Sequence, residues 1–254
     1  MPMLNVNGVT AVSIMHELVK RIAVAAVAIP CIVYIILYAG GLSLALVGLI
    51  IACIASLEWH FITQTPPMLA LGQIGLVVAL FSLLPVFWFL LLVGILWVLG
   101  FSMMCYPRPW ALKSFGLLYV CLVLAGLRSA MLLWLASPWY LLNITALIWV
   151  ADSLAYFVGR QWGRWPLWPS VSPKKSWQGC FAALTPLLFW PMLPWFITGL
   201  IIIGGILGDL LESQFKRLFN VKDSSALIPG HGGCLDRLDS LVAAWFIGSI
   251  CLQY

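Results

Sequence analysis

The sequence predicts an all-α, polytopic integral membrane protein. Of its 254 residues, 63% are hydrophobic and only 8% are charged, whereas roughly 25% are charged in a typical soluble domain. The apolar residues also form blocks long enough to cross a bilayer, which takes about 20 residues per helix. A membrane β-barrel would alternate apolar and polar positions, and runs such as IAVAAVAIPCIVYIILYAG do not.

Nine apolar segments are candidates for membrane-spanning helices. The third, seventh and ninth are short, so eight or ten spans remain possible alternatives. The nine segments cover residues 22–39, 41–60, 68–83, 85–104, 115–136, 139–159, 176–192, 195–215 and 240–254.

The lysines and arginines indicate how these spans are oriented. With nine spans, every loop that carries Lys or Arg lies on the same side as the N-terminus, and the opposite loops carry neither residue. The positive-inside rule then places the N-terminus and the basic loops in the cytoplasm, as in a multi-pass protein of the inner cell membrane. The residues concerned are Lys20, Arg21, Arg108, Lys113, Arg160, Arg164, Lys174, Lys175, Lys216, Arg217, Lys222 and Arg237.

Charge is concentrated in the second half of the chain. Six of the eight acidic residues and eight of the thirteen basic ones lie between residues 152 and 239. We therefore predict one membrane-embedded domain over 1–254, in which residues 1–150 are mainly scaffold and residues 151–240 form the catalytic region. The small residues Gly204 and Gly208 indicate close helix packing within this region.

Two polar stripes interrupt the apolar helices. In GDLLESQFKR, the residues Asp209, Glu212, Ser213 and Lys216 fall on one helix face. Carboxylates are costly near hydrocarbon and usually mark a site, although these could instead lie in interfacial water and pair with Lys216. Asp152 forms a second stripe with Tyr156 and Arg160, and its alternative is a structural hydrogen bond.

The segment KDSSALIPGHGGCLDRLD, residues 222–239, combines charge with glycine. Its glycines allow a tight turn and close approach to a ligand, and successive backbone amides can bind phosphate oxygens. Asp236 and Asp239 supply the hard oxygens that Mg²⁺ prefers, while Lys222, His231 and Arg237 supply positive charge and donors. These residue types predict metal-bridged phosphates. The paired lysines of SVSPKKSWQG could bind substrate, mark topology or contact anionic lipid.

Residues 213–239 resemble the signature of the phosphatidate cytidylyltransferases, with matching spacing over all 27 positions. Cys234 departs from the pattern, where an aliphatic, Met or Phe is expected. ADSLAYFVGR, SPKKSWQG, GDLLES and ELVKRI extend the resemblance. The matching signature residues are Ser213, Phe215, Lys216, Arg217, Lys222, Asp223, Ser225, Ile228, Pro229, His231, Gly232, Gly233, Asp236, Arg237 and Asp239.

The resemblance implies transfer of CMP from CTP to phosphatidic acid, which releases pyrophosphate and leaves CDP-diacylglycerol. It implies Mg²⁺, with or without a second cation, and CTP, phosphatidic acid and membrane lipids as partners, with no nucleic acid. A homodimer is compatible with it. The alternatives are an enzyme acting on another lipid phosphate, and a transporter or anionic-lipid-binding protein; the one-sided polar cluster disfavours transport.

The resemblance also assigns expected roles to individual residues. The metal ligands would be Asp209 and Asp236, with Asp152, Asp223 and Asp239 as second-rank ligands or groups that support them. The residues acting on the reacting phosphates would be Lys222, Asp223, His231, Arg237 and Asp239. The substrate-binding residues would be Ser172, Lys174, Lys175, Ser176, Ser213, Lys216, Arg217, Gly232 and Gly233. Glu58 is interpreted as solvated or structural, and Arg128 as either snorkelling or lining a cavity.

Overall fold

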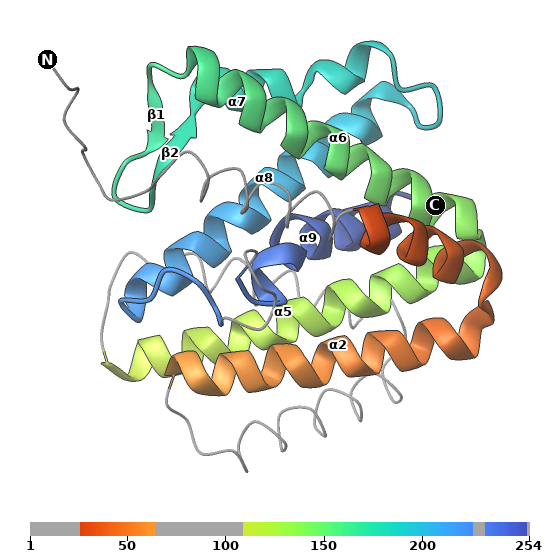
Figure 1. The fold of residues 1–254 in the computed structure, drawn as a ribbon, viewed down its shortest axis with the longest axis horizontal. Helices are drawn as coiled ribbons and strands as arrows, with labels where there is room; N and C mark the ends of the chain where they lie inside the picture. Colours follow the sequence, from red (N-terminus) through yellow and green to blue (C-terminus); the bar gives the residue numbers. More distant parts are fainter. Residues whose placement is uncertain (1–25, 64–108, 226–231, 253–254) are drawn as a thin grey trace, which may run out of the picture.

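The computed structural model describes residues 26–63, 109–225 and 232–252, and these residues form a mostly helical bundle (Figure 1). The predicted spans at 68–83 and 85–104 lie outside the described residues. Three described helices are long and apolar enough to cross a membrane, namely α2, α6 and α8. The predicted helical class is therefore confirmed, and three of the predicted spans coincide with such helices.

The described elements follow the predicted segments except at 176–192 and at a hairpin that the sequence did not predict. Their bounds are Ala26–Tyr38 for the first apolar helix, then α2 Gly40–Thr63, α5 Pro109–Ala136, α6 Pro138–Trp162, β1 Pro166–Trp168, β2 Ser172–Ser176, α7 Trp177–Ala183, the 3₁₀ helix η1 Thr185–Leu188, α8 Trp195–Leu218 and α9 Leu235–Leu252.

The predicted span at 176–192 is wrong as a continuous helix. Ser176 caps α7 by accepting a hydrogen bond from the Gly179 N–H at 3.2 Å, and α7 is only seven residues long. Pro186 is the second residue of the short η1, and Pro191 and Pro194 follow before α8. Proline lacks the N–H that a continuing helix needs and restricts the residue before it, so hydropathy alone overestimates helix length here.

An antiparallel hairpin, β1–β2, lies between α6 and α7 and was not predicted. In Figure 1, α6 and α8 both run from right to left and diverge, so residues 177–194 carry the chain back to the start of α8. Arg160 lies in the last turn of α6 and Lys216 in the last turn of α8. The basic ends of the two helices consequently lie toward the same side of the bundle.

Glycines allow α8 to pack closely against α9. A Cβ atom on Gly208 would lie 2.5 Å from the Asp239 carbonyl oxygen and 2.7 Å from the Ala243 Cβ. Gly204 is similarly covered by the Ile247 side chain. The predicted role of these two glycines in close packing is confirmed, because a side chain at Gly208 would meet the α9 backbone and one at Gly204 would displace the Ile247 side chain.

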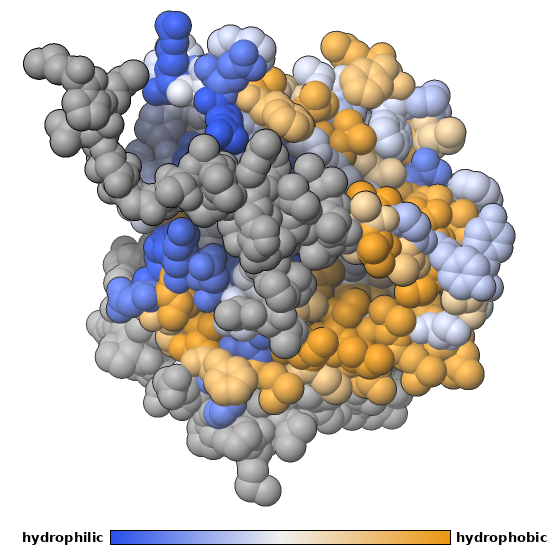
Figure 2. Space-filling view, viewed as in Figure 1, coloured by the Kyte–Doolittle hydropathy of each residue, from blue (hydrophilic) through white to orange (hydrophobic). Residues whose placement is uncertain are grey.

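The outer surface of α2 is apolar. Its exposed side chains include Leu42, Leu46, Leu49, Ile50 and Phe61, and Figure 2 shows hydrophobic residues covering this part of the molecule. A soluble monomer rarely exposes so large a continuous apolar surface. Such a surface is compatible with contact with lipid.

Candidate active site

Three carboxylates meet between α8 and α9. Asp209 and Glu212 are three residues apart on α8 and therefore share a helix face. Asp239 approaches them from α9, beside the Gly208 contact, and one oxygen of each carboxylate lies within 4.8 Å of the others. We call Asp209, Glu212 and Asp239 the acidic cluster; among the described residues it is the group of carboxylates close enough to hold one metal ion.

Two lysines flank the acidic cluster. The Lys175 ammonium lies 2.5 Å from Asp209 Oδ2, and Lys216 Nζ lies 3.2 Å from Glu212 Oε2. Lys175 comes from strand β2, so the hairpin positions a cation against α8. Ser213 Oγ donates to Asp209 Oδ1 at 3.4 Å. The stripe along α8 is therefore part of a packed polar site, in which Glu212 is buried and Asp209 is partly exposed.

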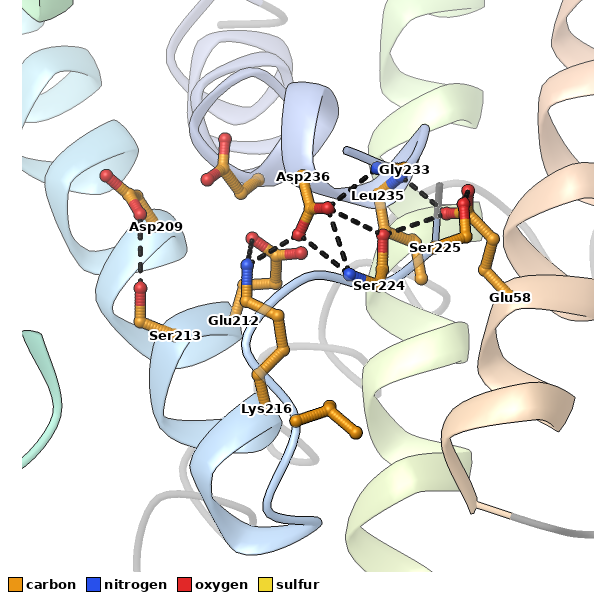
Figure 3. A network of polar contacts seen from close by, with 12 residues as sticks. Glu58, Asp209, Glu212, Ser213, Lys216, Ser224, Ser225, Gly233, Leu235 and Asp236 are labelled. Carbon is orange, nitrogen blue, oxygen red and sulfur yellow. Dashed lines mark hydrogen bonds and ion pairs between the residues drawn. The ribbon is translucent and has the colours of Figure 1, made fainter. Parts of the chain in front are cut away.

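Asp236 lies next to the cluster and is bound by a different set of donors. Lys216 Nζ contacts its Oδ1 at 2.6 Å, and the N–H groups of Gly233 and Ser224 donate to Oδ2 at 2.8 and 2.9 Å (Figure 3). Burial alone would raise the pKa of Asp236, but the Lys216 hydrogen bond and charge and the two backbone amides lower it below its ordinary value. Lys216 therefore bridges Asp236 and Glu212.

Glu58, from the opposite half of the chain, is part of the same network. It is only 3% exposed, and its carboxylate accepts four hydrogen bonds from residues at 224–225 and 234–235. Sequence reasoning classed Glu58 as solvated or structural. The signal that could have singled it out was an isolated carboxylate within an apolar span, which usually has a partner.

Gly232 and Gly233 leave room for this network. Gly232 has φ +81°, a left-handed conformation in which other residues are strained. A Cβ on Gly233 would lie 2.6 Å from Glu58 Oε1 and would overlap Ser224 Oγ. The two glycines thus allow their own backbone to lie close to the Asp236 and Glu58 carboxylates. Any role toward a ligand would come in addition.

The other predicted site residues lie around the network. Ser240 Oγ donates to Asp152 Oδ2 at 2.9 Å, and Arg160 donates to the Tyr156 hydroxyl at 2.9 Å. Arg217 Nε donates to the Val171 carbonyl at 3.2 Å. Ser172 and Lys174 lie on β2; Lys222, Asp223 and Arg237 are exposed; His231 lies outside the described residues.

The acidic cluster has the oxygen ligands of a divalent-cation site. Glu212 is 1% exposed, and Lys216 Nζ lies 3.2 Å from its Oε2. A buried carboxylate is costly unless its charge is offset, and Glu212 shares the Lys216 ammonium with Asp236. Three converging carboxylates supply the hard oxygen ligands that Mg²⁺ binds, so these residues fit a divalent cation.

An apolar cavity of about 440 Å³ lies on another side of α9. Residues of α2, α5 and α6 line it together with Leu238 and Leu241, which flank Asp239 and the cluster along α9. Arg128 is 7% exposed and contributes to the lining. The structure therefore decides between the two sequence interpretations of Arg128, which lines a cavity.

The helical bundle and its site define a protein whose apolar helices enclose carboxylates suited to a cation and lysines suited to phosphate. The chain belongs to the cytidylyltransferase family, whose pattern it matches over residues 19–254. The match includes the acidic cluster, both flanking lysines and Glu58.

Curated relatives are named phosphatidate cytidylyltransferase. One from Haemophilus influenzae is 50% identical over 121 residues, covering 41% of this chain and 42% of the relative. One from Pseudomonas aeruginosa is 34% identical over 194 residues, covering 66% and 70%. One from Staphylococcus haemolyticus is 40% identical over 116 residues, covering 41% and 45%. The chain thus matches less than half the length of two of these relatives.

Proposed function

We propose that this protein transfers CMP from CTP to phosphatidic acid, which gives CDP-diacylglycerol and pyrophosphate. The observation that carries the proposal is the acidic cluster flanked by Lys175 and Lys216, within a chain of the cytidylyltransferase family. The names of the curated relatives and the signature at 213–239 support the same substrates.

The reaction joins two anions. A phosphate oxygen of phosphatidate attacks the α-phosphorus of CTP and forms a new P–O bond. The bond between the α-phosphorus and the α–β bridging oxygen breaks, and the β- and γ-phosphates leave together as pyrophosphate. The phosphomonoester is already largely ionised at neutral pH because its second pKa is about 6. A strong general base is therefore not needed, and the barrier arises chiefly from bringing like charges together.

Residues of this chain would offset that charge. In the proposal Asp209, Glu212 and Asp239 hold Mg²⁺, which supplies charge neutralisation at the phosphates when bound. Lys175 and Lys216 add positive charge at the edge of the cluster, and positioning and electrostatics account for most phosphoryl-transfer catalysis. Asp236 and Asp152 remain proposed ligands, although both lie outside the cluster.

The remaining basic residues would hold the substrates' phosphates. The exposed Lys222 and Arg237, together with His231, are proposed to contact the triphosphate. Lys174 and Arg217 lie near the hairpin and are proposed to contact either the nucleotide or the lipid head group. The apolar cavity beside α9 supports a lipid as the second substrate.

The protein is proposed to span the inner cell membrane with its basic loops in the cytoplasm. A cysteine introduced as Lys174→Cys, on the exposed hairpin, should resist an impermeant thiol reagent in intact cells and react once the cells are lysed. The positive-inside rule gives the reason, since the hairpin lies between basic helix ends. Ready labelling from outside intact cells would contradict the orientation.

Lys222 should bind phosphate as a charge. A lysine beside a polyphosphate acts as a point charge, so Lys222→Arg keeps the charge with altered geometry, whereas Lys222→Gln removes it. The Gln variant should lose at least about tenfold more activity than the Arg variant, with CTP as the varied substrate. Equal activity of the two variants, measured beside their melting temperatures, would discard this role.

The whole proposal is tested with purified protein in detergent, CTP, Mg²⁺ and phosphatidate. Pyrophosphate and a CDP-lipid should appear in equal amounts, and neither should form without lipid or after chelation of the metal. Turnover only with a different lipid phosphate, such as an unsaturated isoprenoid ether lipid phosphate, would reassign the substrate. Absence of pyrophosphate with either lipid would overturn the proposal.

A further inference from the structure

Glu58 connects α2 to two parts of the segment 222–239, namely residues 224–225 and residues 234–235. Its Oε1 accepts from Ser225 Oγ at 2.6 Å and from the Cys234 N–H at 2.8 Å. Its Oε2 accepts from the Leu235 N–H at 2.8 Å and from Ser224 Oγ at 3.2 Å. All four donors are 166 to 177 residues away along the chain.

These donors explain how a carboxylate is tolerated at a buried position. A buried charge is costly unless it is fully hydrogen-bonded. The Cys234 and Leu235 amides lie at the start of α9, where the first N–H groups lack intrahelical partners and the helix dipole favours an anion. Glu58 therefore caps α9 from a different helix, and the interaction stabilises both groups.

Ser224 extends the connection from Glu58 to the acidic cluster. Its hydroxyl lies 3.2 Å from Glu58 Oε2 and 3.0 Å from Asp236 Oδ2, and it has one hydrogen for the two carboxylates. Asp236 in turn contacts Lys216, which contacts Glu212. Figure 3 shows this series of contacts running from α2 across to α8.

We propose that Glu58 is a positioning residue for the nucleotide's phosphates: by holding 224–225 against 234–235, it fixes Ser224 and Asp236 beside Lys216. The proposal rests on the proposed function for the identity of the substrate. It assigns a role in the site to the first half of the chain, which sequence analysis treated as scaffold. Glu58 itself touches neither substrate and acts through the groups that it holds.

The test compares Glu58→Gln with Glu58→Asp and Glu58→Ala. Gln keeps the shape but replaces one acceptor oxygen by a donor, so the donors facing that oxygen lose their partner. For Glu58→Gln, kcat/KM for CTP should fall at least about tenfold, the effect of losing a hydrogen bond to a charged group. KM for phosphatidate should stay within about twofold. Glu58→Asp keeps the charge and should retain more activity than Gln or Ala.

A matched control lies on the same helix. Ser56 is 1% exposed, and its hydroxyl makes no hydrogen bond in the described part of the chain. Ser56→Ala should leave both KM values and kcat within about twofold. Hydrogen exchange at the Cys234 and Leu235 amides should accelerate in Glu58→Gln and not in Ser56→Ala, which tests the contact independently of activity.

The outcomes separate this inference from the proposed function. A wild-type protein that releases no pyrophosphate defeats the proposed function. An active wild type with unchanged CTP kinetics in Glu58→Gln defeats the positioning role. A lower melting temperature with unchanged KM for CTP also defeats it, because it would show a purely structural residue. Faster amide exchange together with the CTP-specific loss supports the proposal.

Discussion

Replacing Asp209 by Asn should lower turnover by about a thousandfold while leaving the protein folded in the membrane. Asn keeps the shape of the side chain, and its single carbonyl oxygen can still accept from either Ser213 or Lys175, which contact different oxygens of Asp209. What it removes is one of the three negative charges that converge in the acidic cluster. Losing the cation would cost several kcal/mol of charge stabilisation in the barrier.

The measurement is pyrophosphate release as a function of Mg²⁺ concentration. Asp209→Glu is the matched variant, because it keeps the charge and moves the carboxylate by one methylene. It should retain more activity than Asn and need more Mg²⁺ for half-maximal rate. If Asp209→Asn kept more than about a tenth of wild-type activity at saturating Mg²⁺, Asp209 would not be a principal ligand.

Replacing Lys216 by Met should destabilise the fold by about 3–5 kcal/mol. The Lys216 side chain is 11% exposed, and it contacts Glu212, which is 1% exposed, and Asp236, which is 9% exposed. Met fills a similar volume, but it leaves two buried carboxylates without their shared cation. Removal of one partner from such a group is costly because the remaining charges stay buried.

Denaturant titration of the protein in detergent measures the free energy of unfolding of each variant. Lys175→Met is the control, since Lys175 and its partner Asp209 are 24% and 32% exposed. Its loss should cost at most about 1 kcal/mol, as for other partly solvated pairs. Equal destabilisation by the two substitutions would show that Lys216 does not hold the two carboxylates together as described.

Hydropathy predicted the helices whose apolar runs are uninterrupted. The predicted spans at 41–60, 139–159 and 195–215 lie within α2, α6 and α8. The span at 176–192 was wrong because mean hydropathy does not register proline, and Pro186, Pro191 and Pro194 prevent a continuous helix. The hairpin was also missed, because a strand of three residues such as β1 is too short to show a sequence pattern.

The site was predicted where its residues are close in sequence. The stripe on α8 follows from helical spacing, and Asp239 had been singled out from its motif. The packing of α8 against α9 places Asp239 beside Asp209 and Glu212, whereas Asp236 contacts Lys216. The sequence does not show this packing. Glu58 was missed because its four donors are more than 160 residues away, and no spacing rule connects such positions.

The bare backbone contact between α8 and α9 has a consequence for which ion the protein prefers. Gly208 precedes Asp209, and the atom that its missing side chain would meet is the carbonyl of Asp239. The distance between the two backbones that carry Asp209 and Asp239 is therefore limited by main-chain contact, and the side-chain rotamers place the carboxylates within that limit. Mg²⁺ needs oxygens at about 2.1 Å and Ca²⁺ accepts them at about 2.4 Å. A methyl group at position 208 would push α8 and α9 apart and widen the acidic cluster, which would favour the larger of the two ions.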